Sequence, residues 1–292
     1  MFIIFGSPRS GTTLLSTTLN LNDHITIPDE SDFIIPAAFI LDRIKDPCVG
    51  KQLLENLIVN TERYEQSLGH FLEPIEARNV IKNSRYQLYD IINNLYQLMA
   101  NKNNTQLGGD KSPNDLLYLR ILIDTSMFES DIKIIHIVRD VRDVVLSLRN
   151  VNWNFEGKDK IEKFLPRLWS DTNLYLYNMF KYKPDKYLFV KYEDMVLNPR
   201  CVFEQITKFL NVPYQEKMFN HSERGLDYKK YSHHVNLSMP FLVDKINTWK
   251  GKPDPLIIKE CNKQATEALR EFGYIVPGRF FNIRHKLQFY LG

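Results

Sequence analysis

The sequence has few cysteines, little net charge and no long hydrophobic run. Its 292 residues include only three cysteines, Cys48, Cys201 and Cys261, which stand far apart, so we expect neither a disulfide framework nor a site of closely spaced thiols. The formal net charge of +3 does not favour a nucleic-acid partner. No apolar run approaches the roughly 20 residues of a membrane-spanning helix, which argues against an integral membrane segment.

Features that separate domains are also missing. The chain contains no Gly/Ser/Pro-rich spacer, low-complexity tract or internal repeat, and 43% of its residues are hydrophobic. We therefore expect a single domain over residues 1–292. The first apolar run begins at Phe2 and leaves no room for a signal peptide, so a cytoplasmic protein is expected. The alternative is the luminal domain of a membrane-anchored enzyme.

The most informative stretch lies at the N-terminus, where an apolar run from Phe2 is followed by Gly-Ser-Pro-Arg-Ser-Gly-Thr-Thr and a helical pattern. Gly6 and Gly11 have the spacing of a phosphate-binding loop, in which backbone N–H groups and a helix N-terminus converge on an anion. A nucleoside triphosphatase would have lysine where Thr12 stands, and Arg9 is the only cation in the loop. ATP or GTP hydrolysis is therefore disfavoured. The glycine spacing alone also fits an ordinary turn of an α/β protein.

A carboxylate-bearing segment follows at residues 24–31 and is bent at a proline. We expect it to bring Asp29 and Glu30 close to the loop. The alternative is a helix N-terminus, with Asp29 or Ser31 capping the apolar run from Phe33. Further along, residues 106–113 predict a short strand that ends in a turn carrying Lys111.

A β-rich run over residues 133–138 predicts a buried parallel strand, and a helical pattern starts soon after it. Arg139 stands at the carboxyl end of this strand and Ser147 lies two helical turns later. Both can face the crevice where open α/β sheets bind ligands. The alternative for Arg139 is a surface ion pair with Asp143. His136, within the strand, is expected to be a core histidine.

The remaining patterns predict supporting helices and one more strand. Residues 37–104 are expected to be largely helical, and Tyr187 to Tyr192 predicts a buried strand. The other helices are expected at 159–182, from Asn198-Pro199 to 210, and at 256–272 after a cap at Asp254-Pro255.

The stretch Pro-Arg-Ser-Gly-Thr-Thr directly after the first strand resembles the 5′-phosphosulfate loop of sulfotransferases that use 3′-phosphoadenosine 5′-phosphosulfate (PAPS). The resemblance continues in chain order and is closest to tyrosylprotein sulfotransferases and related bacterial sulfotransferases. Its further matches are Glu30, Lys111-Ser112-Pro113, Arg139 with Ser147, Tyr192-Glu193-Asp194 and Trp249-Lys250-Gly251. It implies an α/β fold of the P-loop-like sulfotransferase type, with a parallel sheet flanked by helices.

The resemblance also implies roles for single residues. Glu30, with Asp29 as the alternative, is the general base, and Arg9 and Lys111 stabilise the transferred group. Arg139 and Ser147 hold the 3′-phosphate and Tyr192 contacts the adenine. The implied cofactor-binding residues are Arg9, Ser10, Gly11, Thr12, Thr13, Arg139, Ser147, Tyr192, Lys250 and Lys252. The resemblance also implies a second sulfuryl-contacting serine near Ser232.

The expected function is transfer of the sulfuryl group from PAPS to a hydroxyl of an aryl, sugar or other alcohol acceptor. The acceptor is a small molecule, a glycan or a peptide. No metal is expected, because fixed cations take the part that Mg²⁺ has in kinases. The competing readings are a P-loop kinase for a small molecule and a non-catalytic nucleotide-binding protein on the same fold. Neither the acceptor nor the oligomeric state follows from the sequence.

Overall fold

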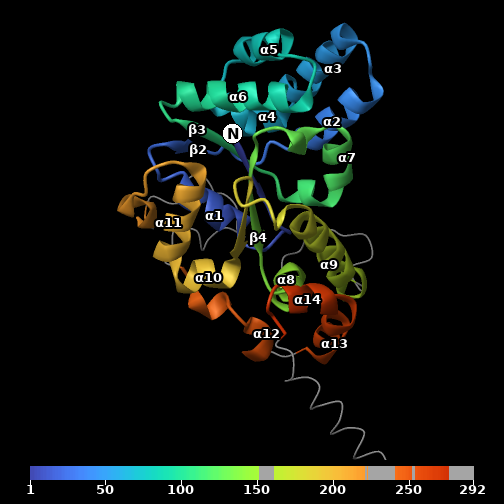
Figure 1. Ribbon diagram of the computed structural model, residues 1–292, viewed down its shortest axis with the longest axis vertical. Coiled ribbons are helices and arrows are strands. Elements are labelled where there is room, and N and C mark those ends of the chain that lie inside the picture. The colour runs from blue at the N-terminus through green and yellow to red at the C-terminus, as the bar shows by residue number, and fades with distance from the viewer. Residues whose placement is uncertain (151–160, 221, 223–240, 252–253, 276–292) are drawn as a thin grey trace, which may run out of the picture. The chain divides into compact units, whose positions relative to one another are not determined.

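A computed structural model describes the chain over residues 1–150, 161–220, 222, 241–251 and 254–275 (Figure 1). The strands are β1 Phe2–Phe5, β2 Ile25–Thr26, β3 Leu107–Lys111, β4 Lys133–Val138 and β5 Tyr187–Lys191. The longer helices are α1 Thr12–Leu19, α2 Ile34–Arg43, α3 Pro47–Val59, α5 Pro74–Asn83, α6 Leu88–Lys102, α8 Val141–Asn150, α9 Ile161–Phe180, α11 Pro199–Leu210 and α13 Pro255–Gln264. The shorter ones are α4 Glu62–Gln66, η1 Leu68–His70, η2 Pro113–Tyr118, α7 Leu119–Asp124, η3 Met127–Glu129, α10 Tyr192–Leu197, η5 Glu216–Phe219, η8 Val243–Lys245, α12 Thr248–Gly251 and α14 Thr266–Glu271.

The chain divides into two compact units, each of which is described by itself. The first comprises Met1–Val138 with Met179–Leu242, and the second comprises Arg139–Asn178 with Val243–Gly292. All five strands lie in the first unit. The expectation of a single domain over the whole chain stays a prediction.

The five strands form one parallel sheet in the order β2-β3-β1-β4-β5. This confirms the expected α/β fold with a parallel sheet flanked by helices. From β1 the chain passes to β2 and β3 on one side and then to β4 and β5 on the other. The strand order therefore reverses at β1. In open α/β sheets the ligand site lies at this reversal, beyond the carboxyl ends of the strands.

The central strands are buried because their sequences are apolar, apart from Lys133 and His136 of β4. Every residue of β1 is at most 1% exposed, and in β4 only Lys133 at the start reaches partial exposure. Such runs are typical of parallel strands covered on both faces. His136 of β4 is fully buried, and its Nδ1 lies 2.7 Å from the Tyr187 hydroxyl of β5. The prediction of a core histidine is confirmed.

The register of β1 with β3 determines which side chains stand beside the N-terminal loop. Ile4 of β1 pairs with Lys111, the last residue of β3, so the two strands end at the same edge of the sheet. Thr26 of β2 pairs with Gly108, which places the segment after β2 along β3. The sheet thus brings the loop after β1, the end of β3 and the segment after β2 to one edge.

Helices of the first unit pack along the β3 side of the sheet, where α6 contacts β3 and α5 contacts both α6 and α3 (Figure 1). A backbone contact explains one glycine of β3: a Cβ at Gly108 would lie 2.3 Å from the Tyr96 carbonyl oxygen of α6. The helical character expected for residues 37–104 is confirmed. In the second unit, α12 and α13 both pack on α8.

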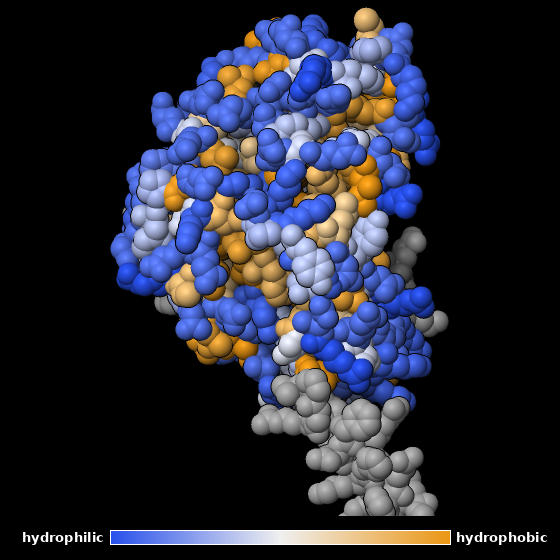
Figure 2. All heavy atoms as spheres, viewed as in Figure 1, coloured by the Kyte–Doolittle hydropathy of each residue, from blue (hydrophilic) through white to orange (hydrophobic). Residues whose placement is uncertain are grey.

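The face of the molecule in Figure 2 is covered mainly by hydrophilic residues, with hydrophobic residues in patches between them. This distribution is ordinary for a protein whose large apolar side chains fill its core. Among the described helices, none combines the length and the apolar character needed to cross a membrane.

Candidate functional site

The loop between β1 and α1 is shaped by two glycines. A Cβ at Gly6 would lie 2.7 Å from the carbonyl oxygen of Ile137 in β4, so no larger residue fits at the end of β1. Gly11 adopts a φ of +91°, a left-handed conformation that favours glycine. A Cβ there would also lie 2.5 Å from Cδ2 of Tyr192. Both glycines of the predicted phosphate loop are therefore required by the backbone.

The loop ends at an uncapped helix N-terminus. Gly11 is the residue before α1, and no side chain caps this helix. The first N–H groups of a helix lack intrahelical partners, and the helix dipole makes this end attractive to an anion. Ser10, fully buried in the loop, has a hydroxyl without a hydrogen-bond partner among the described residues. A buried hydroxyl beside uncapped N–H groups fits a phosphate or phosphosulfate group.

The other predicted loop residues surround the same turn. Arg9 is partly exposed and adopts a φ of +68°, while Thr12 is buried and Thr13 is partly exposed at the start of α1. The turn is closed by a hydrogen bond from the Ser10 N–H to the Ser7 carbonyl oxygen, 3.0 Å long. Arg9 thus supplies a positive charge within the loop.

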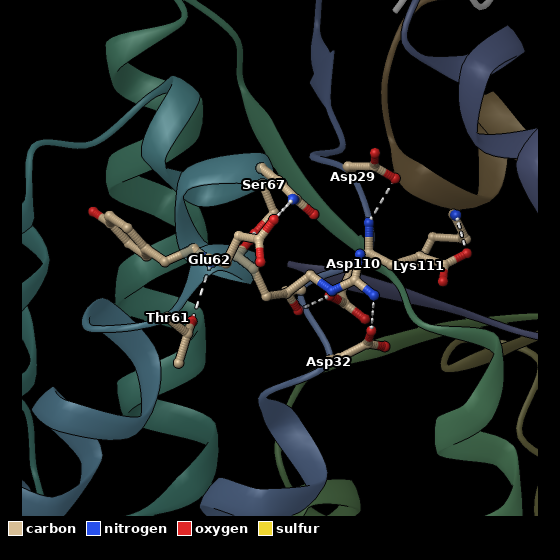
Figure 3. Close-up of polar contacts among 12 residues, drawn as sticks. Asp29, Asp32, Thr61, Glu62, Ser67, Asp110 and Lys111 are labelled. Atoms are coloured by element: carbon tan, nitrogen blue, oxygen red, sulfur yellow. Dashed lines mark hydrogen bonds and ion pairs between the residues drawn. The ribbon is translucent and has the colours of Figure 1, made fainter. Parts of the chain in front are cut away.

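Glu30 and Lys111 are brought together from distant parts of the chain. The Lys111 ammonium donates a hydrogen bond to Glu30 Oε1 over 2.6 Å (Figure 3). The Lys111 side chain is only 1% exposed, whereas that of Glu30 is 29% exposed. Lys111 was expected in a turn after the strand, which is wrong because it is the last residue of β3. A buried lysine paired with a partly exposed carboxylate leaves Glu30 accessible to a second molecule.

The helix-cap alternative for the acidic segment is wrong. The helix that follows, α2, begins at Ile34, and no side chain caps it. Asp29 instead accepts a hydrogen bond from the Glu30 N–H at 2.9 Å, and Ser31 donates to Asp110 Oδ1 at 2.9 Å. Figure 3 shows Asp29 and Asp32 near Asp110 and Lys111 of β3.

The surroundings of Glu30 contain more carboxylates than cations. Burial raises the pKa of Asp110, although hydrogen bonds from Tyr96 and Ser31 oppose this. Burial and the nearby Asp110 charge raise the pKa of Asp115 well above its ordinary value. Burial also raises the pKa of Asp32, which Arg63 opposes through an ion pair of 2.9 Å. Within the described residues, no three His, Cys, Asp or Glu side chains are placed to hold a metal ion.

Tyr192 opens α10, is 7% exposed and packs its ring against Gly11 of the loop. Its predicted contact with adenine stays a prediction. The ring lies against Gly11, the residue before α1, which explains why the loop needs glycine at this point.

Arg139 and Ser147 belong to the second unit. Arg139 follows β4 directly, is 8% exposed and donates through Nη2 to the Lys245 carbonyl oxygen over 2.6 Å. Ser147 is partly exposed on α8. The alternative of a surface ion pair between Arg139 and Asp143 is wrong, because both are buried and Asp143 accepts from the Trp249 N–H at 3.0 Å.

The segment near Trp249 contains the last predicted residues. Lys250 of α12 is exposed, with its ammonium 5.4 Å from the centroid of the Trp249 ring. The buried Arg142 also packs on this indole, with its guanidinium carbon 3.8 Å from the ring centroid. Lys252 and Ser232 lie outside the described residues.

Three residues near Glu30 were missed by the sequence analysis: Asp110, Tyr96 and Ser31 in its hydrogen-bonding role. Tyr96 and Asp110 are fully buried, and the Tyr96 hydroxyl donates to Asp110 Oδ1. An aspartate inside a predicted strand, next to a candidate catalytic lysine, was the available signal, because strands rarely contain buried aspartate without a partner.

Comparisons with known proteins relate the chain to sulfotransferases. The profile described as "Sulfotransferase family" matches residues 2–216. Over 283 residues the chain is 24% identical to Protein-tyrosine sulfotransferase 1 of Danio rerio, a match that covers 94% of this chain and 72% of that protein.

Two solved structures share the fold. The sulfotransferase domain from the curacin biosynthetic pathway has a TM-score of 0.61 at 19% identity, over 95% of this chain and 98% of that one. The sulfotransferase domain from the Synechococcus PCC 7002 olefin synthase has a TM-score of 0.59 at 22% identity, over 95% of each chain. Since the profile spans most of the sequence, from β1 to η5, this chain belongs to the sulfotransferase family.

Proposed function

We propose that this protein transfers the sulfuryl group of PAPS to a hydroxyl group of an acceptor, with Glu30 as the general base. The observation that carries the proposal is the Glu30–Lys111 pair, 2.6 Å apart, at the sheet edge where the loop after β1 begins. A base and a cation beside an anion-binding loop are the groups that transfer of an anionic group requires.

The chemistry divides among these groups. Glu30 takes the proton from the acceptor hydroxyl, whose oxygen forms a bond to sulfur as the bond from sulfur to the 5′-phosphate oxygen breaks. Arg9 and Lys111 stabilise negative charge on the sulfuryl and departing phosphate oxygens. The N-terminal N–H groups of α1, with Ser10, Thr12 and Thr13, bind the 5′-phosphosulfate. A positioned base typically contributes about 10²–10⁴ in rate.

The remaining predicted residues bind the nucleotide. Arg139 and Ser147 hold the 3′-phosphate, Tyr192 contacts the adenine, and Lys250 and Lys252 contact phosphates. These assignments rest on the family resemblance of the motifs. Arg139 is suited to its role because a guanidinium makes strong hydrogen bonds to phosphate oxygens.

The acceptor is a hydroxyl on an aryl, sugar or other alcohol, in a small molecule, glycan or peptide. A tyrosine peptide is the first acceptor to assay, because the Danio rerio relative is named as a protein-tyrosine sulfotransferase. 4-Nitrophenol and a simple sugar test the other two classes.

Two experiments test the proposal. Calorimetry should show that 3′-phosphoadenosine 5′-phosphate (PAP) binds at least tenfold more tightly than ATP, whereas a P-loop kinase would prefer ATP. Transfer of radiolabelled sulfur from PAPS should then persist in EDTA, because Arg9 and Lys111 supply the positive charge. PAP binding without any release of sulfate or transfer to an acceptor would indicate a non-catalytic nucleotide-binding protein.

A further inference from the structure

Three buried polar side chains form a cluster behind Glu30. Asp110 Oδ1 accepts hydrogen bonds from the hydroxyls of Ser31, at 2.9 Å, and of Tyr96. The Tyr96 oxygen also lies 3.0 Å from Ser31 Oγ, so each group contacts the other two. Ser31 is 3% exposed, and Tyr96 and Asp110 are fully buried. None of the three has a role in the proposed chemistry.

The cluster joins the same two segments as the Glu30–Lys111 pair. Ser31 directly follows Glu30, and Asp110 directly precedes Lys111 at the end of β3. Two consecutive residues therefore attach the segment to β3. Glu30 forms a partly exposed ion pair with Lys111, and Ser31 forms a buried hydrogen bond with Asp110. Tyr96 adds a third element, because α6 is packed along β3.

The segment around Glu30 needs such an attachment. Between β2 and α2 it has no regular secondary structure, and Asp32 adopts a φ of +52°, which is unfavourable for a residue with a side chain. The Tyr96 ring also stacks on Phe33, with centroids 6.4 Å apart. The backbone on the C-terminal side of Glu30 is thus held by the contact of Ser31 with Asp110 of β3 and of Phe33 with Tyr96 of α6.

Burying these three polar side chains costs desolvation free energy, which indicates that the cluster has a specific role. Burial raises the pKa of Asp110 and raises that of Tyr96 well above its ordinary value, so the site disfavours both charged forms. Apolar residues of similar size would avoid this desolvation cost. A hydrogen-bonded polar cluster, in contrast, accepts one geometry only.

We propose that Ser31, Tyr96 and Asp110 are positioning residues that hold Glu30 beside Lys111, and that they set the turnover rate through Glu30. This inference rests on the proposed function, in which Glu30 is the base. Misplacing a catalytic group by about 1 Å can lower the rate about 100-fold.

The test uses Tyr96→Phe and Ser31→Ala, each of which removes one hydroxyl. The matched control is Tyr64→Phe, because Tyr64 is also buried and donates one hydrogen bond, to the Leu72 carbonyl oxygen at 2.7 Å. We expect both test variants to lower kcat for sulfuryl transfer from PAPS about 10- to 100-fold, with the Kd for PAP within about twofold of the unaltered protein. The control should lose similar stability and keep its kcat.

A double-mutant cycle separates this inference from the proposed function. If the cluster acts through Glu30, adding Tyr96→Phe to Glu30→Gln should change the residual rate less than about twofold. A further full loss in the double variant would overturn the positioning role while leaving Glu30 as the base. Near-normal turnover in Glu30→Gln alone would instead overturn the proposed function.

A second readout needs no acceptor. Hydrogen exchange of the backbone amides in residues 27–33 should become at least tenfold faster in Tyr96→Phe and stay unchanged in Tyr64→Phe. Equal protection of this segment in the two variants would show that the cluster does not hold it.

Discussion

Lys111 Nζ lies 2.6 Å from Glu30 Oε1, although the two residues are 81 positions apart in the chain. The lysine is buried at the end of β3 and the glutamate is partly exposed on the segment after β2. An ammonium held against one carboxylate oxygen leaves the other oxygen for a proton from an acceptor. The pair therefore combines a base and a stabilising cation at one point of the sheet edge.

The role of Glu30 is tested by Glu30→Gln. This change keeps the shape and much of the hydrogen bonding but removes the basic carboxylate, so turnover should fall about 10²- to 10⁴-fold while the Kd for PAP hardly changes. Initial rates with PAPS and calorimetry with PAP measure the two effects. Asp29→Asn is the matched control. Its effect should be mild, because an amide oxygen can still accept the hydrogen bond that the Glu30 N–H donates to Asp29. A collapse in Asp29→Asn with normal turnover in Glu30→Gln would move the base to Asp29.

The loop requires glycine at position 11. Gly11→Ala introduces a Cβ 2.5 Å from the Tyr192 ring at a φ of +91°. The left-handed conformation alone costs a residue with a Cβ about 1–2 kcal/mol. A loss of 1 kcal/mol lowers the melting temperature by about 2–4 °C in a domain of about 150–250 residues. Thermal unfolding should detect this change. Gly251→Ala is the control, because nothing lies within 4 Å of its added Cβ. Equal melting temperatures for the two variants would contradict the strain at Gly11.

Arg139 and Ser147 are predicted to recognise the 3′-phosphate. Arg139→Ala and Ser147→Ala each remove a hydrogen bond to a charged phosphate, a loss of about 1.5–3 kcal/mol, so the Kd for PAP should rise about 10- to 150-fold. The Kd for adenosine 5′-phosphate, which lacks the 3′-phosphate, should stay the same. Arg149→Ala removes an equal charge from the exposed face of α8, where Arg149 pairs with Asp254, and should leave the Kd for PAP within about twofold. Equal weakening of both nucleotides would refute the assignment.

Local patterns in the sequence were sufficient for the strands and for most helices. The apolar runs of β1 and β4 are buried, as expected. The strand expected from Tyr187 to Tyr192 was also expected to be buried, but Leu188, Phe189 and Lys191 of β5 are partly exposed, and Tyr192 opens α10. Asp254 caps α13 through the Leu256 and Ile257 N–H groups as predicted. The helix expected over 256–272 is instead two helices, α13 and α14, with Ala265 between them.

Contacts between distant segments could not be predicted in the same way. The attachment of Ser31 to Asp110 joins residues 79 positions apart, and nothing in the local sequence of either residue specifies its partner. Lys111 was expected in a turn, and its burial could not be predicted because it depends on the pairing of β3 with β1 and on the approach of Glu30. The family resemblance indicated that Lys111 matters, but the buried cluster behind it became visible only in the fold.

The stability of the folded protein should depend on pH through the carboxyl group of Asp115. This residue is 4% exposed and Oδ2 has no hydrogen-bond partner among the described residues. Burial, with the Asp110 charge, raises its pKa well above the ordinary 3.8, so the folded state binds its proton more tightly than the unfolded state. The free energy of unfolding therefore falls as the pH rises from about the unfolded pKa of Asp to the raised pKa.

Asp115→Asn removes this penalty, because the amide stays neutral at every pH. We expect the variant to gain melting temperature relative to the unaltered protein at pH 7 and to gain less, or nothing, at pH 3.5, measured by calorimetry at matched ionic strength. Asp254→Asn provides the opposite case, since the hydrogen bond from Arg149 lowers the Asp254 pKa and the stability it contributes is present at pH 7 and lost in acid. That variant should lose melting temperature at pH 7 and lose less at pH 3.5. A destabilised Asp115→Asn at pH 7 would mean that the Asp115 carboxylate is charged in the folded protein and stabilises it.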